Sequence, residues 1–160
     1  MSLELIIFFN ISVGLLLTLY NLWLIIKAKA TENWDKTDGT ITNSELVDLT
    51  STGEANLTFK PNIEYSYTLN GNKYKSKRIY FGSHIMTSYN KRHCQKLVER
   101  YAKGKKVIVY FDRLNEKQSV LETGIKYQLI IGLILGLIIT EIGLTFLRNP
   151  NILSDFLTSK

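Results

Sequence analysis

The chain has 160 residues, of which 45% are apolar and 21% are charged, and its formal net charge is +6 at pH 7. Residues 27–126 carry 18 Lys and Arg against 11 Asp and Glu, whereas the two ends together carry 2 against 3. A single cysteine excludes a disulfide scaffold, and the apolar content excludes a disordered chain. Two apolar ends around a charged middle exclude an ordinary compact soluble domain and indicate a membrane protein.

The first apolar segment covers residues 3–26, and its only charge is Glu4 at the outer edge. A helix of that length rises about 36 Å, which exceeds the roughly 30 Å of hydrocarbon in a bilayer. We therefore predict a transmembrane helix over 3–26. A removable signal peptide is the alternative, because Ala28-Lys29-Ala30 has the form of a cleavage site, but the apolar run is too long and no basic segment precedes it.

A polar linker is expected over 27–38, followed by a β-rich domain over 39–124. Thr, Ile and Val alternate roughly over 39–49 and cleanly over 62–69, which predicts two half-buried strands. In the second strand, Ile63, Tyr65 and Tyr67 should face the core. Asn70-Gly71 is a strong hairpin signal because both residues tolerate positive φ, so residues 73–81 should form the partner strand.

Helical spacing replaces this alternation over about 88–103, where Cys94, Leu97, Val98 and Tyr101 fall near one face and Gly104 follows as a stop. Residues 106–111 are strongly β-prone, residues 112–117 should turn, and residues 119–122 should form a last short strand. The expected middle domain is a small antiparallel sheet or open barrel with one short helix.

The second apolar segment covers residues 127–147, between Lys126 and Arg148, and predicts a second transmembrane helix followed by a polar tail over 148–160. The fold class is therefore an α+β membrane protein in which two transmembrane helices flank the β domain. Basic residues concentrate on the inner flanks of the two spans. The positive-inside rule then places the middle domain in the cytoplasm and both termini outside.

Glu141 is the one ionisable residue well inside a span, where a carboxylate costs about 2.5 to 3.5 kcal/mol on insertion scales. Antiparallel helices would bring Asn10 to a similar depth, so we expect a hydrogen bond between Asn10 and Glu141. The alternatives are a side chain that snorkels toward Arg148 and a proton or ion relay.

Gly132-x-x-x-Gly136, continued by Thr140 and Gly143, forms a strip of small residues along the second span. Such strips allow two helix backbones to approach closely. We expect this strip to pack against the first span, with homo-oligomerisation through the spans as the alternative.

The chain lacks the sequence motifs of phosphate-binding loops, zinc proteases, redox or zinc-binding cysteine pairs, α/β-hydrolases and dinucleotide-binding folds. His93 and Cys94 are adjacent, and adjacent residues on a helix point about 100° apart, so they cannot act as a catalytic dyad. The spacing of His84, His93 and Cys94 matches no known metal site. We expect no catalytic residue, no metal and no cofactor, and hence no enzyme.

Basic residues give the richer signal. One group lies on the hairpin and after the helix: Lys73, Lys75, Lys77, Arg78, Lys103, Lys105 and Lys106. On a membrane-tethered domain such a face would contact anionic lipid headgroups, at about 1 kcal/mol per cation near the surface. An unknown protein partner and an ordinary solvated face are the alternatives, and tethering argues against nucleic acid.

Several motifs span nearly the whole chain: Trp34-x-x-Thr37-x-Gly39-x-Ile41, Pro61-x-Ile63-x-Tyr65-x-Tyr67, Gly71, Tyr74 to Ser76, Gly104-x-x-Val107-x-Val109-Tyr110-x-Asp112 and Val120-Leu121-Glu122. With these motifs the chain resembles the bacterial domain of unknown function 3592 family. The resemblance implies a first span, a β-rich middle domain and a second span in a bacterial membrane protein, and the family offers no established catalytic activity to transfer. Tyr110-Phe111-Asp112-Arg113-Leu114-Asn115-Glu116 lacks both prolines that the family usually has in this run.

The function expected from these features is that of a non-enzymatic membrane protein whose β domain is a binding, scaffolding or accessory module. One alternative is an immunity or toxin-antagonist protein that acts in the membrane. A second alternative is a subunit of a membrane enzyme or transporter.

Overall fold

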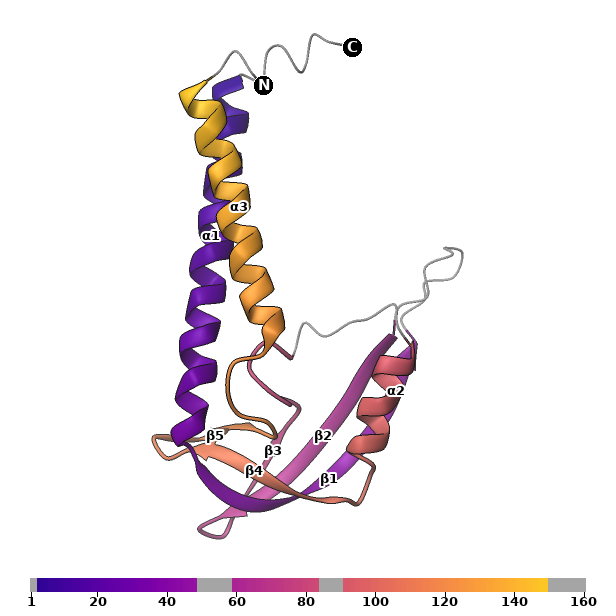
Figure 1. Cartoon of the computed structure of the whole chain (residues 1–160). Coiled ribbons are helices and arrows are strands. Elements are labelled where there is room, and N and C mark those ends of the chain that lie inside the picture. Colours follow the sequence, from indigo (N-terminus) through magenta and orange to yellow (C-terminus); the bar gives the residue numbers. More distant parts are fainter. Residues whose placement is uncertain (1–2, 49–58, 84–90, 150–160) are drawn as a thin grey trace. The chain divides into compact units, whose positions relative to one another are not determined.

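A computed structural model describes residues 3–48, 59–83 and 91–149. The chain divides into two compact units, one made of Met1–Ile26 with Lys126–Lys160 and the other of Lys27–Ile125. The elements in chain order are α1 (Leu3–Ala30), η1 (Thr31–Asn33), β1 (Asp35–Asp48), β2 (Phe59–Leu69), β3 (Asn72–Ser76), α2 (Lys91–Arg100), β4 (Lys106–Asp112), β5 (Asn115–Val120) and α3 (Tyr127–Arg148) (Figure 1).

The first unit is a pair of long antiparallel helices, α1 and α3, which lie side by side (Figure 1). Both are long and apolar enough to cross a membrane, by length and composition. The two apolar runs of the sequence are therefore helical, as predicted. The tail beyond Asn149 and the turn expected around residues 51–54 lie outside the described residues.

The segment expected to be a polar linker is ordered secondary structure instead. Residues 27–30 continue α1, η1 follows at once, and β1 begins at Asp35. Lys27 and Lys29 lie in the last turn of α1, where positive charge stabilises the helix dipole. The Thr31 hydroxyl donates to the Ala28 carbonyl at 2.6 Å, and Lys29 pairs with Glu32 at 2.6 Å. These bonds stabilise the end of α1 and the turn of η1 that leads to β1.

The second unit is one five-stranded antiparallel sheet with strand order β3-β2-β1-β4-β5. The buried face of β2 is the predicted one, since Ile63, Tyr65 and Tyr67 are buried. Asn70 and Gly71 form the hairpin turn with φ of 50° and 82°. Positive φ at both positions is the turn geometry that matches the twist of two paired strands.

The strand that follows the hairpin is shorter than the sequence predicts, because β3 ends at Ser76 and not near residue 81. Beyond Ser76, serine side chains, and not the carbonyl groups of a neighbouring strand, accept hydrogen bonds from the backbone N–H groups. The Ser76 hydroxyl accepts from the N–H of Arg78 at 3.3 Å, and the Ser83 hydroxyl accepts from those of Ile79 and Tyr80 at 3.1 and 3.3 Å. Ser side chains that bind nearby backbone in this way divert the chain from sheet pairing.

The last hairpin also differs from the prediction. The expected turn over 112–117 shrinks to Arg113 and Leu114, and β5 runs over Asn115–Val120 and not over 119–122. The Asp112 carboxylate accepts from the N–H of Leu114 at 2.9 Å, and Arg113 pairs with Asp35 on β1. An Asp side chain that binds the backbone two residues on makes a tight turn without the missing prolines.

The sheet curls so that its two edge strands, β3 and β5, approach each other. In β1 one extra residue, Thr42, forms a bulge between Ile41 and Asn43, which increases the local twist. Tyrosine hydroxyls then bridge to β5. Tyr67 donates to the Glu116 carbonyl at 2.6 Å, and Tyr74 donates to the Glu116 carboxylate at 2.7 Å. The result is an open barrel in which side-chain hydrogen bonds bridge the gap between the edge strands β3 and β5.

Tyr65 lies at the centre of the core with 0% of its surface exposed. Its hydroxyl donates to the Arg78 carbonyl and is bonded to the Ser119 hydroxyl, both at 3.0 Å. Burial raises the pKa of Tyr65 to about 12. The core around it is formed by Ile41, Ile63, Tyr67, Ile79, Tyr80, Tyr101, Val109 and Leu121.

Helix α2 packs on β1 and β2. It is shorter than predicted, since it ends at Arg100, and residues 88–90 of the predicted span lie outside the described residues. Cys94 is buried and contacts the Phe59 carbonyl at 3.6 Å, and Ser44 of β1 donates to the Val98 carbonyl at 3.1 Å. The face predicted from the helical spacing is therefore the buried face.

Tyr65→Phe should lower the free energy of unfolding by about 1 to 3 kcal/mol, because it leaves the Ser119 hydroxyl and the Arg78 carbonyl without a buried partner. Denaturant titration of the full chain in detergent, followed by tyrosine fluorescence, measures this loss. Tyr110→Phe is the matched control, because the Tyr110 ring is half-exposed and its hydroxyl has no partner among the described residues. Equal losses in the two variants would contradict the assigned role of Tyr65.

Candidate functional site

The contact between α1 and α3 is a ladder of small residues that runs along both helices. The pairs are Gly132 with Asn21, Gly136 with Thr18, Thr140 with Gly14, and Gly143 with Asn10 and Ile11. A Cβ atom added at Gly136 would lie 2.8 Å from the Thr18 backbone nitrogen. There is no room for any side chain there, so the two backbones touch as small-residue strips permit. The structure thus places the predicted Gly132 and Gly136 against α1.

Most polar side chains in this ladder bond within their own helix. Thr18 donates to the Gly14 carbonyl, Asn21 to the Leu17 carbonyl and Thr140 to the Gly136 carbonyl, each at 2.8 Å. Hydroxyl and amide groups satisfied in this way do not need water or a partner across the interface. The helices are held by close packing and not by a polar network.

The structure does not join Asn10 to Glu141, contrary to the expectation from their depth. The side-chain amide oxygen Oδ1 of Asn10 is buried without a hydrogen-bond partner and lies against Gly143. Glu141 points away from the interface, with 65% of its side chain exposed, and pairs with Arg148 at 3.7 Å. Glu141 and Gly143 are about 200° apart around the helix, so only one of them can face α1. The alternative of a carboxylate directed toward Arg148 is the arrangement observed.

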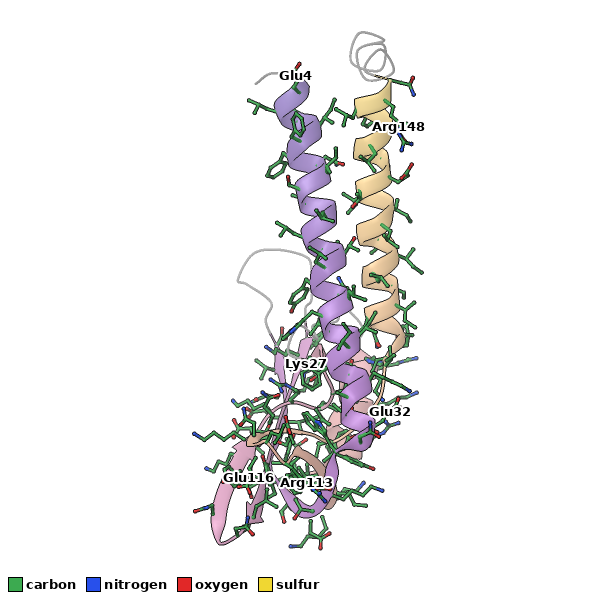
Figure 2. All side chains as sticks on the ribbon, turned by 90° about the vertical axis from the view of Figure 1, so that its left-hand side faces the viewer. Glu4, Lys27, Glu32, Arg113, Glu116 and Arg148 are labelled. Atoms are coloured by element: carbon green, nitrogen blue, oxygen red, sulfur yellow. The ribbon has the colours of Figure 1, made fainter. Side chains whose placement is uncertain are left out.

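Large apolar side chains cover the outside of the helix pair. They project from both helices along the pair, from the end that Glu4 and Arg148 mark to the region of Lys27 (Figure 2). Those with at least half of their surface exposed include Leu5, Phe8, Phe9, Leu15, Leu16, Leu19, Trp23, Ile26, Tyr127, Ile131, Leu135 and Leu137. A helix of a soluble protein exposes one polar face, and neither α1 nor α3 has one.

Four of the seven predicted basic residues share the outer face of the sheet. By register, Lys75 lies beside Ser66, Ser66 beside Thr40, and Thr40 beside Lys106, while Lys73 lies beside Thr68 in the next row. Lys106 donates to the Thr40 hydroxyl at 3.2 Å. Lys77 reaches the same face, where it pairs with Glu64 at 2.5 Å.

The other three basic residues lie elsewhere. Arg78 packs its guanidinium 4.7 Å from the centre of the Phe81 ring. Lys105 donates to the Arg100 carbonyl at 2.7 Å, and Lys103 is exposed in the connection from α2 to β4. The seven predicted basic residues therefore do not share one face of the domain.

A shallow polar hollow of about 380 Å³ lies on this outer face. Lys73 and Lys106 line it together with Thr40, Ser66 and Thr68, and Asp38 contributes a carboxylate. The face as a whole is of mixed charge, because Asp38 and Glu64 accompany the lysines.

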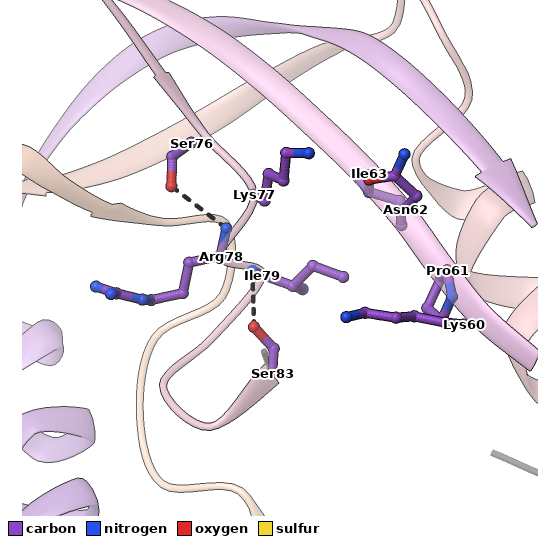
Figure 3. A pocket seen from close by; sticks show the side chains of 9 residues that line it. All are labelled: Lys60, Pro61, Asn62, Ile63, Ser76, Lys77, Arg78, Ile79 and Ser83. Atoms are coloured by element: carbon purple, nitrogen blue, oxygen red, sulfur yellow. Dashed lines mark hydrogen bonds between the residues drawn. The ribbon is translucent and has the colours of Figure 1, made fainter. Parts of the chain in front are cut away.

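A second pocket, of about 350 Å³, lies where β3 ends and β2 continues without a neighbouring strand on that side among the described residues. Its nine lining residues are Lys60, Pro61, Asn62, Ile63, Ser76, Lys77, Arg78, Ile79 and Ser83 (Figure 3). None of the nine is acidic. Sequence reasoning missed this pocket, because Lys60 is brought to Ile79 and Ser83 only by the early end of β3.

Within residues 3–48, 59–83 and 91–149, no group of three or more His, Cys, Asp or Glu side chains could hold a metal ion. Cys94 is buried and His93 is exposed, so the two side chains point in different directions on α2. His84 lies outside the described residues. Tyr101 donates to the Glu122 carboxylate at 2.7 Å, the same distance as that from Tyr74 to Glu116, and burial together with this bond raises the pKa of Tyr101.

Comparison with known proteins gives one match. The model of the family described as Domain of unknown function (DUF3592) matches residues 37–126, which cover more than half of the chain. Neither a curated protein nor a solved structure matches the chain.

Gly136→Leu should separate α1 from α3, because the new side chain meets the Thr18 backbone. Spin labels at the exposed positions Phe9 and Leu147, in a Cys94→Ser background, report the distance between the helices by pulsed electron resonance. We expect a longer and broader distance distribution for Gly136→Leu. Leu137→Phe, which adds bulk on the exposed side, should leave it unchanged, and an equal effect of both substitutions would contradict the ladder.

Proposed function

The chain belongs to the domain of unknown function 3592 family, and from this premise we propose that it is a two-span integral membrane protein whose β domain is a non-enzymatic binding module. In this proposal α1 and α3 are the membrane spans. The domain of residues 27–125 is the part that meets partners in water.

The observation that carries the proposal is the outer surface of the helix pair. Once Gly132 and Gly136 have brought the helices together, their large apolar side chains still point outward on all other sides. Exposed apolar surface costs about 25 cal/mol per Å² in water, and hydrocarbon removes that cost. Glu4 and Arg148 lie at one end of the pair, and Lys27 and Lys126 lie at the other, which fits a span bounded by two polar surfaces.

The orientation follows from charge. Lys27 and Lys29 end α1, and Lys126 precedes α3, whereas the described residues at the other end of the pair carry only Glu4 and Arg148. Lys and Arg next to short spans favour the cytoplasmic side. We therefore place the β domain in the cytoplasm at the bacterial inner membrane, with both termini outside.

The candidate partner surface is the outer face of the sheet, where Lys73, Lys75 and Lys106 stand among hydroxyl side chains. Cations tethered near a bilayer attract anionic headgroups at about 1 kcal/mol each. Lys77 contributes less, because Glu64 already neutralises it. The proposed role is to hold the domain against anionic lipid or an acidic protein.

Alkaline carbonate extraction of membranes tests the anchor, and the full chain should stay in the membrane pellet. Labelling with a membrane-impermeant thiol reagent tests the orientation. Asn72→Cys in a Cys94→Ser background offers an exposed thiol beside the hairpin turn. We expect labelling only after cell lysis.

The wild-type chain is the control, because its single thiol, Cys94, is buried and should react slowly before and after lysis. Release by carbonate would overturn the anchor. Labelling of intact cells would place the domain outside and overturn the proposed orientation.

A further inference from the structure

We propose that the pocket between β2 and the chain leaving β3 binds a phosphate group, carried by a small soluble molecule or by a lipid headgroup. The proposal deepens the binding role proposed above and rests on it. The site is built from residues 60–63 of β2 and residues 76–83 (Figure 3).

Lys60 supplies the charge. Its side chain is half-buried and reaches from β2 toward Ile79 and Ser83 (Figure 3). It forms no hydrogen bond or ion pair with any of the described residues. A partly buried ammonium without a counter-charge is costly, and an anionic ligand supplies the missing partner.

Ser83 supplies a donor. Its oxygen is buried and already accepts the N–H groups of Ile79 and Tyr80 at 3.1 and 3.3 Å. Those two bonds fix the oxygen and leave the hydroxyl hydrogen for an acceptor. Among the described residues no acceptor takes it. A fixed hydroxyl near a free ammonium is a pair of donors suited to an oxyanion.

The charge balance of the pocket favours an anion. Lys77 is paired with Glu64 at 2.5 Å, and Glu64 does not line the pocket. The guanidinium of Arg78 points away from Lys60 (Figure 3), and it packs on the Phe81 ring. Lys60 is therefore the cation that reaches into the pocket without a carboxylate partner among the described residues, and none of the nine lining residues is acidic.

The size and the walls define the ligand class. A volume of about 350 Å³ exceeds that of an inorganic ion and lies at the small end of ligand pockets. Pro61, Ile63 and Ile79 give apolar walls beside the polar groups. A phosphate ester fits this combination, because its three terminal oxygens use the ammonium and hydroxyl donors while its organic part contacts the walls.

Titration of the full chain in neutral detergent with glycerol 3-phosphate tests the site. Amide chemical shifts of residues 60–63 and 76–83 should change in a saturable way. Lys60→Gln should weaken the apparent affinity at least tenfold, whereas Lys60→Arg should retain most of it. Lys117→Gln, which removes an exposed lysine from the other edge strand, is the matched control and should stay within twofold of wild type.

Absence of saturable shifts in the wild-type chain would overturn the proposal, and so would equal weakening by Lys117→Gln. Repeating the titration in nanodiscs distinguishes the two sources of phosphate. Competition by phosphatidic acid, but not by phosphatidylcholine, identifies a lipid headgroup, and undiminished binding identifies a soluble ester. A chain that resists carbonate extraction yet binds no phosphate would refute this site and leave the membrane anchor standing.

Discussion

Backbone contact between two apolar helices is the constraint on which the structure depends. Gly14, Gly132, Gly136 and Gly143 each face a side chain or backbone that leaves no room for a Cβ atom. Because the interface is filled by small residues, the large apolar residues of both helices are displaced to the outside. A pair built in this way cannot bury its own apolar surface, so it needs an apolar surrounding, which we propose to be the bilayer.

The antiparallel pairing also determines how the domain between the helices is connected. The end of α1 and the start of α3 lie at the same end of the pair, and the 27–125 segment leaves and returns there. That segment has its own core, centred on Tyr65 and Val109. Its sheet is closed by phenol hydroxyls that reach Glu116 and Ser119, so it is stabilised by contacts within the unit. A self-contained domain of this kind is compatible with the binding role that we propose.

Local signals in the sequence predicted much of the fold. The apolar runs gave two helices, and the alternation of Ile63, Tyr65 and Tyr67 predicted the buried face of β2. Asn70-Gly71 predicted the hairpin, because its positive φ values depend on those two residues alone. The strip from Gly132 to Gly143 was visible as a candidate contact with α1, and the structure places it there.

Features that depend on distant partners could not be predicted in the same way. Ser76 and Ser83 end β3 early by binding backbone that the sequence shows as strand. The depth of Asn10 matched that of Glu141, but depth does not give the rotation of a helix, and Glu141 faces outward to Arg148. The pocket around Lys60 combines segments that meet only after β3 has ended, so no motif marks it.

The measurement that tests the central claim most directly is the accessibility of nitroxide labels at Leu16 and Leu137 in reconstituted bilayers. Both side chains are more than half exposed on the helix pair, at 67% and 53%. Oxygen dissolves in hydrocarbon and a nickel chelate stays in water, so both labels should collide more often with oxygen. A label at Asn72 in the β domain should show the reverse. Greater access of the nickel chelate to Leu16 and Leu137 would contradict a pair of helices that faces lipid.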